Sequence, residues 1–400
     1  MAAVAIVLVF LLTTLVLGQF GLTDFQSALT FPGRITGAIL IAVAATTLLG
    51  ALAVMDHWFR SSFAYSGLAA LISAIAAFVA NALLLAKTWS NGDYSAYLAV
   101  FGLLTAGSAW AAVVVWRTSV LIPAPKRVAT AVIVSSAIAI ANFGYQNLYQ
   151  PSQMGAKPLI KLTVGEPVLS EDRRAFAVPV DIRLENQSGM GFYVLGTEIH
   201  AMGERVSLSA KDRLRQQWRT DAEQWKNFEE DNPLSRREIY EPGELVGAQP
   251  MMPYGGWLEA HDAFATRVVV QMPMDTPYDQ VAFYASASFA RKDRLGLESI
   301  AFKGYTWGGG KVPQWVKSEE SDAIVYRGRV EENNAIDKRT RDARYVTVYW
   351  RFGQHGADVS AVIARDGEEG TKTESVSRYG IINADTGPVE LTLWDVKSRR

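Results

Sequence analysis

The sequence predicts two parts of different fold class: an N-terminal all-α transmembrane bundle of about five helices, and an all-β, sandwich-like soluble domain with one inserted amphipathic helix. Two observations predict this division. Residues 1–150 contain long apolar runs without charged residues, whereas from residue 157 onward apolar and polar residues alternate between recurring turn residues. We therefore expect a transmembrane domain over residues 1–150 and a β-rich domain over residues 157–400.

Composition and charge narrow the function classes. The first 150 residues hold six basic and three acidic residues, so 33 of the 39 Lys and Arg and 37 of the 40 Asp and Glu follow them. Such a mixed, slightly acidic surface argues against a nucleic-acid partner, which would favour a strongly basic face. The lack of cysteine excludes disulfides, thiolate metal sites and cysteine nucleophiles. We expect no cofactor.

Five apolar runs are long enough to cross a bilayer, because about 20 helical residues span a hydrocarbon core of about 30 Å. None of the runs contains Asp, Glu, Lys, Arg or His. The alternative of a signal peptide for the first run is disfavoured, since it lacks a basic start and a good small-residue cleavage site. The predicted helices cover approximately residues 2–18, 35–55, 65–86, 96–116 and 128–148.

The orientation prediction rests on the loop after the fourth run, which carries Arg117, Lys126 and Arg127. Loops rich in Lys and Arg stay in the cytoplasm. Alternation then places the N-terminus inside and the β-rich domain outside, with four basic residues in inner loops against two in outer loops. Lys157 and Lys161, just past the last run, would also lie outside, which makes the inner and outer counts of basic residues equal. We expect a multi-pass protein of the cell membrane with an extracytoplasmic C-terminal domain.

Polar residues within the spans are candidates for helix packing. Ser73 and Asn81 belong to a stripe of small or polar residues at four-residue spacing, and Asn142 lies in the fifth run. Small side chains let helices approach closely, and an amide can form an interhelical hydrogen bond. The alternative is a polar pathway lining. Transport is disfavoured, because transport pathways usually retain ionisable groups at membrane depth.

Strand patterns begin at residue 159. Residues 176–184 place five apolar side chains on one face, and residues 192–202 are expected to pair with them after a turn at residues 186–191. This hairpin resembles those of immunoglobulin-like sandwiches, although the Cys-Trp-Cys pattern of true immunoglobulin domains is absent. Further strands are predicted at residues 264–272, 280–290, 323–330, 344–352, 357–365, 375–382 and 389–396.

Two further segments bear on the domain organisation. Residues 209–232 have an apolar stripe at helical spacing, which predicts an amphipathic helix inserted among the strands. The glycines at residues 308–310 mark a possible division of the β-rich region into two parts; a single domain of this length is the alternative.

Catalytic and metal-binding motifs are sparse. The best catalytic constellation joins Glu229, at the end of the predicted inserted helix, with His261 and Asp262, as acid and base for hydrolysis of an envelope glycan. The ordinary interpretation of the carboxylates at residues 229–231 is a solvated charge run. The four histidines lie far apart and never at the i, i+4 spacing of zinc helices, so we expect no metal site.

A basic strip at residues 338–344 is the candidate binding surface. It includes Arg339 and Arg341, and Trp307, Trp315 and Trp350 lie near it in sequence. Basic residues with aromatic residues suit contact with anionic lipid or polymer. The alternative is a mobile loop between strands.

These features predict a membrane protein that presents its β-rich domain for binding or for assembly of an envelope or membrane complex. The expected partners are the lipid bilayer and either another membrane protein or an envelope polymer. A hydrolase acting on the envelope, with its site in the β domain, is the alternative, and a transporter or channel subunit is the third hypothesis.

Overall fold

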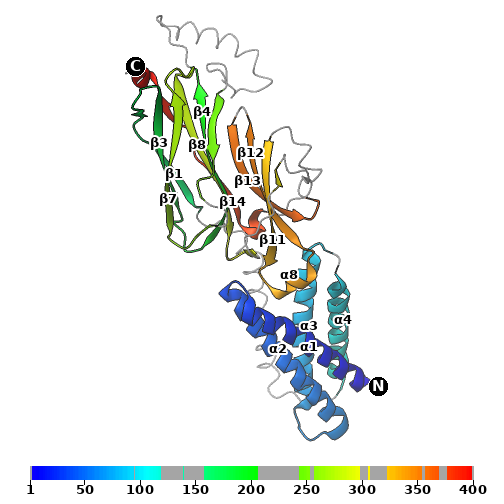
Figure 1. Cartoon of the computed structure of the whole chain (residues 1–400). Coiled ribbons are helices and arrows are strands. Elements are labelled where there is room, and N and C mark those ends of the chain that lie inside the picture. The colour runs from blue at the N-terminus through cyan, green and yellow to red at the C-terminus, as the bar shows by residue number, and fades with distance from the viewer. Residues whose placement is uncertain are drawn as a thin grey trace, which may run out of the picture.

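The computed structural model describes residues 2–93, 95–118, 138, 157–205, 243–252, 256–297, 305–306, 322–353, 356–368 and 376–398. An N-terminal helical region is followed along the chain by a strand-rich region of antiparallel sheets. The helices occupy one end of an elongated molecule and the sheets occupy the other (Figure 1). The predicted change from apolar helices to strands is therefore confirmed.

Four helices in the described part are long and apolar enough to cross a membrane. They are α1 (Ala2–Ser27), α2 (Phe31–Met55, continued by the π-helical turn η1, Asp56–Arg60), α3 (Ser66–Ser90) and α4 (Ala96–Trp116). Their order and spacing follow the first four predicted runs. The fifth predicted helix, residues 128–148, lies outside the described residues except for Ile138, and Asn142 lies outside with it.

The first helix is longer than predicted. The predicted helices end at residue 18 and begin again at residue 35, but α1 continues to Ser27 and α2 begins at Phe31. The break between the two helices comes just before Phe31, because Thr30 caps the start of α2. The Thr30 side chain accepts a hydrogen bond from the Gly33 N–H at 3.2 Å. Gly21 does not end α1; a Cβ there would lie 2.8 Å from the Gly37 carbonyl oxygen, so glycine is required for close contact with α2.

Two sheets share the first core of the strand-rich region. The four-stranded sheet contains β1 (Leu159–Val164), β2 (Val168–Leu169), β3 (Ala175–Glu185) and β7 (Ala263–Pro273). The six-stranded sheet contains β4 (Phe192–Glu204), β5 (Glu244–Gln249), β6 (Trp257–Leu258), β8 (Gln280–Arg291), β14 (Ile381–Asp385) and β15 (Val389–Thr392). Apolar residues of β3 and β7 pack with those of β4 and β8 between these sheets.

The predicted pairing of residues 176–184 with residues 192–202 is wrong. β3 pairs with β1, β2 and β7, whereas β4 pairs with β5, β6 and β8. Both strands bury apolar residues in the same core from opposite sides. The turn between them crosses from one sheet to the other, and the Asn186 side chain fixes it by donating hydrogen bonds to the carbonyls of Met190 and Glu259.

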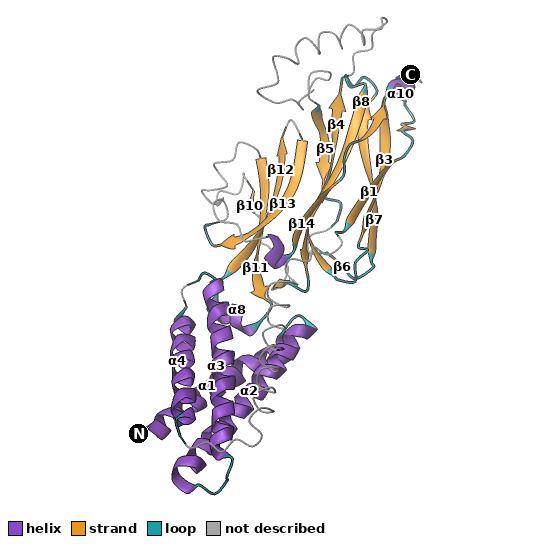
Figure 2. Cartoon of the chain, turned by 180° about the vertical axis from the view of Figure 1, so that it is seen from behind, coloured by secondary structure: helices purple, strands orange, loops and turns teal. Residues whose placement is uncertain are grey.

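A third sheet covers the other face of the six-stranded sheet. It contains β9 (Leu295–Leu297), β10 (Tyr305–Thr306), β11 (Asp322–Glu332), β12 (Arg344–Gly353) and β13 (Gly356–Arg365). Adjacent residues of β4 divide between the two cores: Val194 enters the first, and Leu195 enters the second with Val348 and Val359. The six-stranded sheet is therefore the middle layer (Figures 1 and 2).

Three short helices complete the described fold: α8 (Ala335–Thr340), α9 (Val376–Tyr379) and α10 (Trp394–Ser398). About half of the strand predicted at residues 375–382 is the helix α9, and about half of the strand predicted at residues 389–396 is the helix α10. Gly380, with φ of 61°, separates α9 from β14. The predicted helix at residues 209–232 and the possible boundary at residues 308–310 lie outside the described residues.

Candidate functional site at the helix–sheet junction

The helix α8, between β11 and β12, lies against the ends of the apolar helices α1 and α3 (Figures 1 and 2). Asn334 begins it, because its side chain accepts a hydrogen bond from the Asp337 N–H at 2.8 Å. Ala335 and Ile336 are buried in an apolar cluster with residues of all four apolar helices: Leu17, Phe20, Leu40, Ala44, Ala80, Leu84 and Phe101. The strand-rich region thus inserts one helix into the end of the bundle.

The end of α1 holds α8 at two points. Asp24, which is only 2% exposed, accepts a hydrogen bond from the Ala335 N–H at 2.6 Å. That N–H belongs to the first turn of α8 and has no acceptor within its own helix. The guanidinium of Arg339 lies 4.9 Å from the centre of the Phe20 ring, within the range of a cation–π contact.

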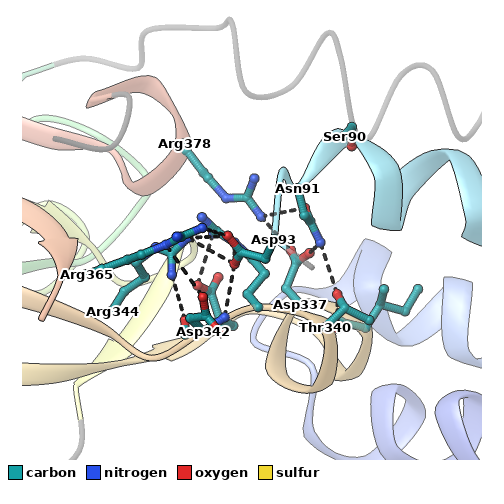
Figure 3. Close-up of polar contacts among 12 residues, drawn as sticks. Ser90, Asn91, Asp93, Asp337, Thr340, Asp342, Arg344, Arg365 and Arg378 are labelled. Atoms are coloured by element: carbon teal, nitrogen blue, oxygen red, sulfur yellow. Dashed lines mark hydrogen bonds and ion pairs between the residues drawn. The ribbon is translucent and has the colours of Figure 1, made fainter. Parts of the chain in front are cut away.

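The end of α3 forms the second set of contacts (Figure 3). The Asn91 side chain donates hydrogen bonds to Asp337 at 2.9 Å and to Thr340 at 3.1 Å, and accepts one from Arg378 at 3.2 Å. Arg378 and Lys87 also pair with the Asp337 carboxylate, at 3.2 and 3.7 Å. Burial alone would raise the pKa of Asp337, but Lys87, Arg378 and the Asn91 amide outweigh it, and the pKa is lowered.

The loop between α3 and α4 supplies the most heavily engaged carboxylate, Asp93 (Figure 3). Its side chain is fully buried and pairs with Arg365, with Arg344 at 3.0 Å and with Arg341 at 3.9 Å. The Asp342 N–H also donates to it at 3.0 Å. Burial would raise the pKa of Asp93, yet the Asp342 hydrogen bond and the guanidiniums lower it below the usual range. Asp93 is therefore ionised at neutral pH.

Arg341 extends the contacts from Asp93 into the sheets. Its guanidinium donates to Glu332 at 3.1 Å and to the Tyr379 hydroxyl at 2.6 Å, and that hydroxyl donates to Glu332 at 2.6 Å. Burial and the neighbouring Glu332 raise the pKa of Tyr379, so the hydroxyl keeps its proton. The Tyr379 ring lies in the second core. A continuous set of polar contacts thus joins the apolar helices to the packing between the sheets.

The chemistry of this junction suits attachment. Its carboxylates are paired with cations of the same chain, and buried ion pairs of this kind fix one arrangement of the elements that carry them. Removing a single partner from such a cluster leaves an uncompensated buried charge, which is far more costly than the loss of an exposed ion pair. The junction therefore holds the strand-rich region in one orientation on the helix ends.

The predicted packing residues of α3 contact neighbouring helices. The Ser73 hydroxyl lies 2.9 Å from the carbonyl oxygen of Thr46 in α2 and equally close to that of Ala69. The Asn81 amide donates to the Thr13 hydroxyl of α1 at 3.2 Å. Both side chains thus link α3 to another helix, whereas Asn142 lies outside the described residues.

The predicted catalytic and binding residues are scattered. His261 and Asp262 form an exposed turn before β7, where His261 has φ of 61° and the Asp262 carboxylate accepts from the Ala263 N–H. Arg339 and Arg341 belong to the junction. Trp350 is a partly buried residue of β12. Glu229, Trp307 and Trp315 lie outside the described residues.

A second buried polar cluster lies between β4, β8 and β13. The Glu198 carboxylate, which is fully buried, is 2.8 Å from His200 Nδ1 and accepts from the Ser286 hydroxyl at 3.1 Å. The His200 ring stacks on Tyr284 at 4.8 Å. Because Ser286 bonds to the carboxylate and not to the imidazole, the geometry is not that of a Ser-His-acid triad. Within the described residues, no three His, Asp or Glu side chains are placed to hold a metal ion.

Sequence reasoning missed the residues that build the junction. Asp24 and Asp93 were counted only as acids between the spans, and Asn91 was not singled out. A signal for α8 was present, because Asn334 followed three residues later by Asp337 is a plausible helix start. No local pattern indicated that this helix would meet the ends of α1 and α3.

The fold and the junction define a chain in which apolar helices suited to a membrane carry a domain of antiparallel sheets. No protein-family model and no curated protein matches the sequence. Among solved structures, the chain is similar to the crystal structure of Spo0M, a sporulation control protein from Bacillus subtilis. The identity is 7% over 61% of this chain and 93% of that chain, and the TM-score of 0.21 is too low to support an inference about fold or function.

Proposed function

We propose that this chain is a multi-pass membrane protein that presents a sandwich-like β domain outside the cytoplasm, in a fixed orientation, for binding or for assembly of an envelope or membrane complex. The observation that carries the proposal is the junction. A domain tethered only by a linker would need neither the buried pairs of Asp93 nor the insertion of Ile336 among the helices. Fixed presentation is useful to a protein whose partner lies at a defined place relative to the membrane.

The positions of Thr118 and Leu159, which flank the predicted fifth span, support five crossings. His57 Nε2 lies 3.1 Å from the Thr118 hydroxyl, so η1 and the end of α4 lie together. α4 begins next to Asp93 at the junction and runs for 21 residues, or about 30 Å, to the other end of the bundle. The next described strand, β1, begins at Leu159 in the domain beyond the junction. We propose that the chain crosses the membrane once more between these two ends, at the predicted span of residues 128–148.

The charges at the two ends of the bundle support an extracytoplasmic domain. Arg60 and Arg117 lie at the end marked by the His57–Thr118 contact, and Lys126 and Arg127 follow soon after Arg117 in the sequence. At the junction end, Lys87 is paired with Asp337. Loops rich in Lys and Arg favour the cytoplasmic side.

Labelling of single cysteines tests this orientation, because the native chain has no cysteine. Val168→Cys adds a thiol at an exposed position of β2, and Ser62→Cys adds one in the exposed turn after η1. A membrane-impermeant maleimide is expected to label Val168→Cys in intact spheroplasts, and Ser62→Cys only after permeabilisation. The reverse pattern would place the β domain in the cytoplasm and remove every extracellular partner from consideration.

Photo-crosslinking in native membranes tests the binding role. In the described part of the chain, β7 pairs only with β3, and an open strand edge is a common docking place for another protein. A photoreactive residue at Val269, which is 47% exposed on β7, is expected to give one discrete adduct. The same variant reconstituted alone in lipid should give no adduct.

The matched control is a photoreactive residue at Leu15, which is 69% exposed on α1 and is expected to face lipid. The Val269 adduct should weaken when Asp93 is replaced by Asn, because the domain then loses its fixed orientation. If Val269 crosslinks no more than Leu15, the edge of β7 is not a binding surface and this part of the proposal fails.

A further inference from the structure

An exposed tryptophan and a lysine form a small patch at β6. Trp257 is 50% exposed, and the Lys292 ammonium lies 5.4 Å from the centre of its ring and 5.6 Å from that of Tyr193. The same ammonium pairs with Glu259 at 2.6 Å. We call these four residues the β6 patch. Among the described Phe, Tyr and Trp side chains of the strand-rich region, Trp257 and Trp394 are the exposed ones, at 50% and 37%.

The β6 patch lies at the end of the sheets that faces the membrane helices. Trp257 pairs with Tyr193, and Tyr193 pairs with Ala290 of β8. The next residue, Arg291, packs against Gly380, where an added Cβ would lie 2.9 Å from the Arg291 Cβ. Gly380 follows Tyr379, whose hydroxyl bonds to Arg341 at the junction. Figure 2 shows β6 at the end of the sheets nearest the helices.

The start of the strand-rich region lies at the same end of the sheets as the β6 patch. β1 starts at the same end, because Leu159 pairs with Glu185 and Glu185 pairs with Ala263, at the turn after β6. The predicted fifth span ends about ten residues before Leu159. A fully extended segment of that length reaches at most about 35 Å. With the proposed fifth span, the start of β1 and the turn beside it lie within this distance of the membrane.

The basic strip expected to contact lipid is engaged elsewhere. Arg341 and Arg344 pair with Asp93, and Arg339 lies over the Phe20 ring. The β6 patch has the chemistry of an interfacial anchor, since a tryptophan ring suits the boundary between acyl chains and headgroups and a lysine reaches phosphate. Because Glu259 offsets the charge of Lys292, such an anchor does not require anionic lipid.

We propose that the β6 patch rests on the phospholipid headgroups of the membrane that the helices cross, with Trp257 as the anchor. The domain is then held at two places: by the buried polar contacts of the junction and, to one side, by the lipid surface. This inference extends the proposed presentation of the β domain and does not depend on which partner the domain binds.

A fluorescent probe at residue 260 tests the contact. Ala260→Cys introduces the only thiol, at an exposed position of the turn after β6, and Val168→Cys provides a control on β2, beside the opposite end of β3. The labelled full-length protein is placed in phosphatidylcholine nanodiscs that contain a headgroup spin-labelled lipid. Quenching is expected to be several times stronger at residue 260 than at residue 168. Equal quenching at the two positions would overturn the proposal.

A second variant tests the role of the ring itself. In the Ala260→Cys background, Trp257→Ser is expected to reduce the quenching at least to half, whereas Trp257→Tyr, which keeps an amphipathic ring, should retain most of it. Since Trp257 is half exposed, neither change is expected to prevent folding, and circular dichroism checks this. Unchanged quenching in Trp257→Ser would show that Trp257 is not the anchor.

Discussion

Asparagine in place of Asp93 is expected to loosen the strand-rich region from the helix ends. Asparagine has the same shape but no charge, so the guanidiniums of Arg341, Arg344 and Arg365 would lose their shared carboxylate. Breaking a buried ion pair by removing one partner costs about 3–5 kcal/mol. We expect a loss of this size in the free energy that holds α8 on the bundle, measured by denaturant titration of the protein in detergent micelles.

The matched control is Asp181→Asn. Asp181 pairs with Arg267 at 2.7 Å, but both side chains are at least half exposed on the four-stranded sheet. Water screens such a pair, so the same substitution should leave the unfolding transition almost unchanged. Equal effects of the two substitutions would mean that the Asp93 cluster is not a structural attachment. A double-mutant cycle between Asp93→Asn and Arg344→Gln should also show strong coupling. Once one of the two charges has been removed, removing the other breaks no further ion pair between them.

Gly37→Ala is expected to separate α1 from α2. A Cβ at residue 37 would meet only backbone atoms: the Phe25 nitrogen, the Gly21 oxygen at 2.7 Å and the Asp24 carbonyl carbon at 2.9 Å. Backbone cannot rotate away as a flexible side chain can, so the helices must move apart, at a cost of about 1–3 kcal/mol or more. Because Asp24 also accepts the Ala335 hydrogen bond, the displacement should reach α8.

Gly102→Ala is the control for that prediction. Gly102 lies within α4, and a Cβ there would have no atom within 4 Å. Alanine favours a helix over glycine by about 1 kcal/mol, so this variant should be as stable as the native chain or slightly more stable. Thermal unfolding in detergent micelles distinguishes the two. A Gly37→Ala protein as stable as Gly102→Ala would show that α1 and α2 do not cross as closely as described.

The elements of the fold were largely predictable because their signals are local. The four apolar helices follow from runs of about 20 uncharged residues, and the strand at residues 176–184 follows from its alternation. The pairing of that strand was not predictable. Alternation shows that a strand has one buried face. It does not show which strand is hydrogen-bonded to it in the same sheet and which strand packs against it across the core.

The candidate site was hidden for a related reason. A carboxylate such as Asp93 in a short loop has the sequence environment of a solvated residue, and only the approach of β12 and β13 from 250 residues away buries it. The basic strip at residues 338–344 likewise fits both a mobile loop, the ordinary interpretation, and a contact with lipid. The start of the helix at Asn334 can be recognised from neighbouring residues. The contacts of this segment with Asp24, Asn91 and Asp93 cannot, because those residues lie far away in the sequence.

The distance along the chain between the partners of the junction also imposes an order of events during synthesis. The Asn91–Asp337 and Asp93–Arg344 contacts join residues 246 and 251 positions apart, and the Asp24–Ala335 contact spans 311 positions. At about 5–20 residues per second, a ribosome needs about 10–50 s to make the 250 residues that separate Asp93 from its guanidiniums. Once α4 has been made, early in that interval, the first four helices are available for insertion, while the end of the nascent bundle still lacks α8.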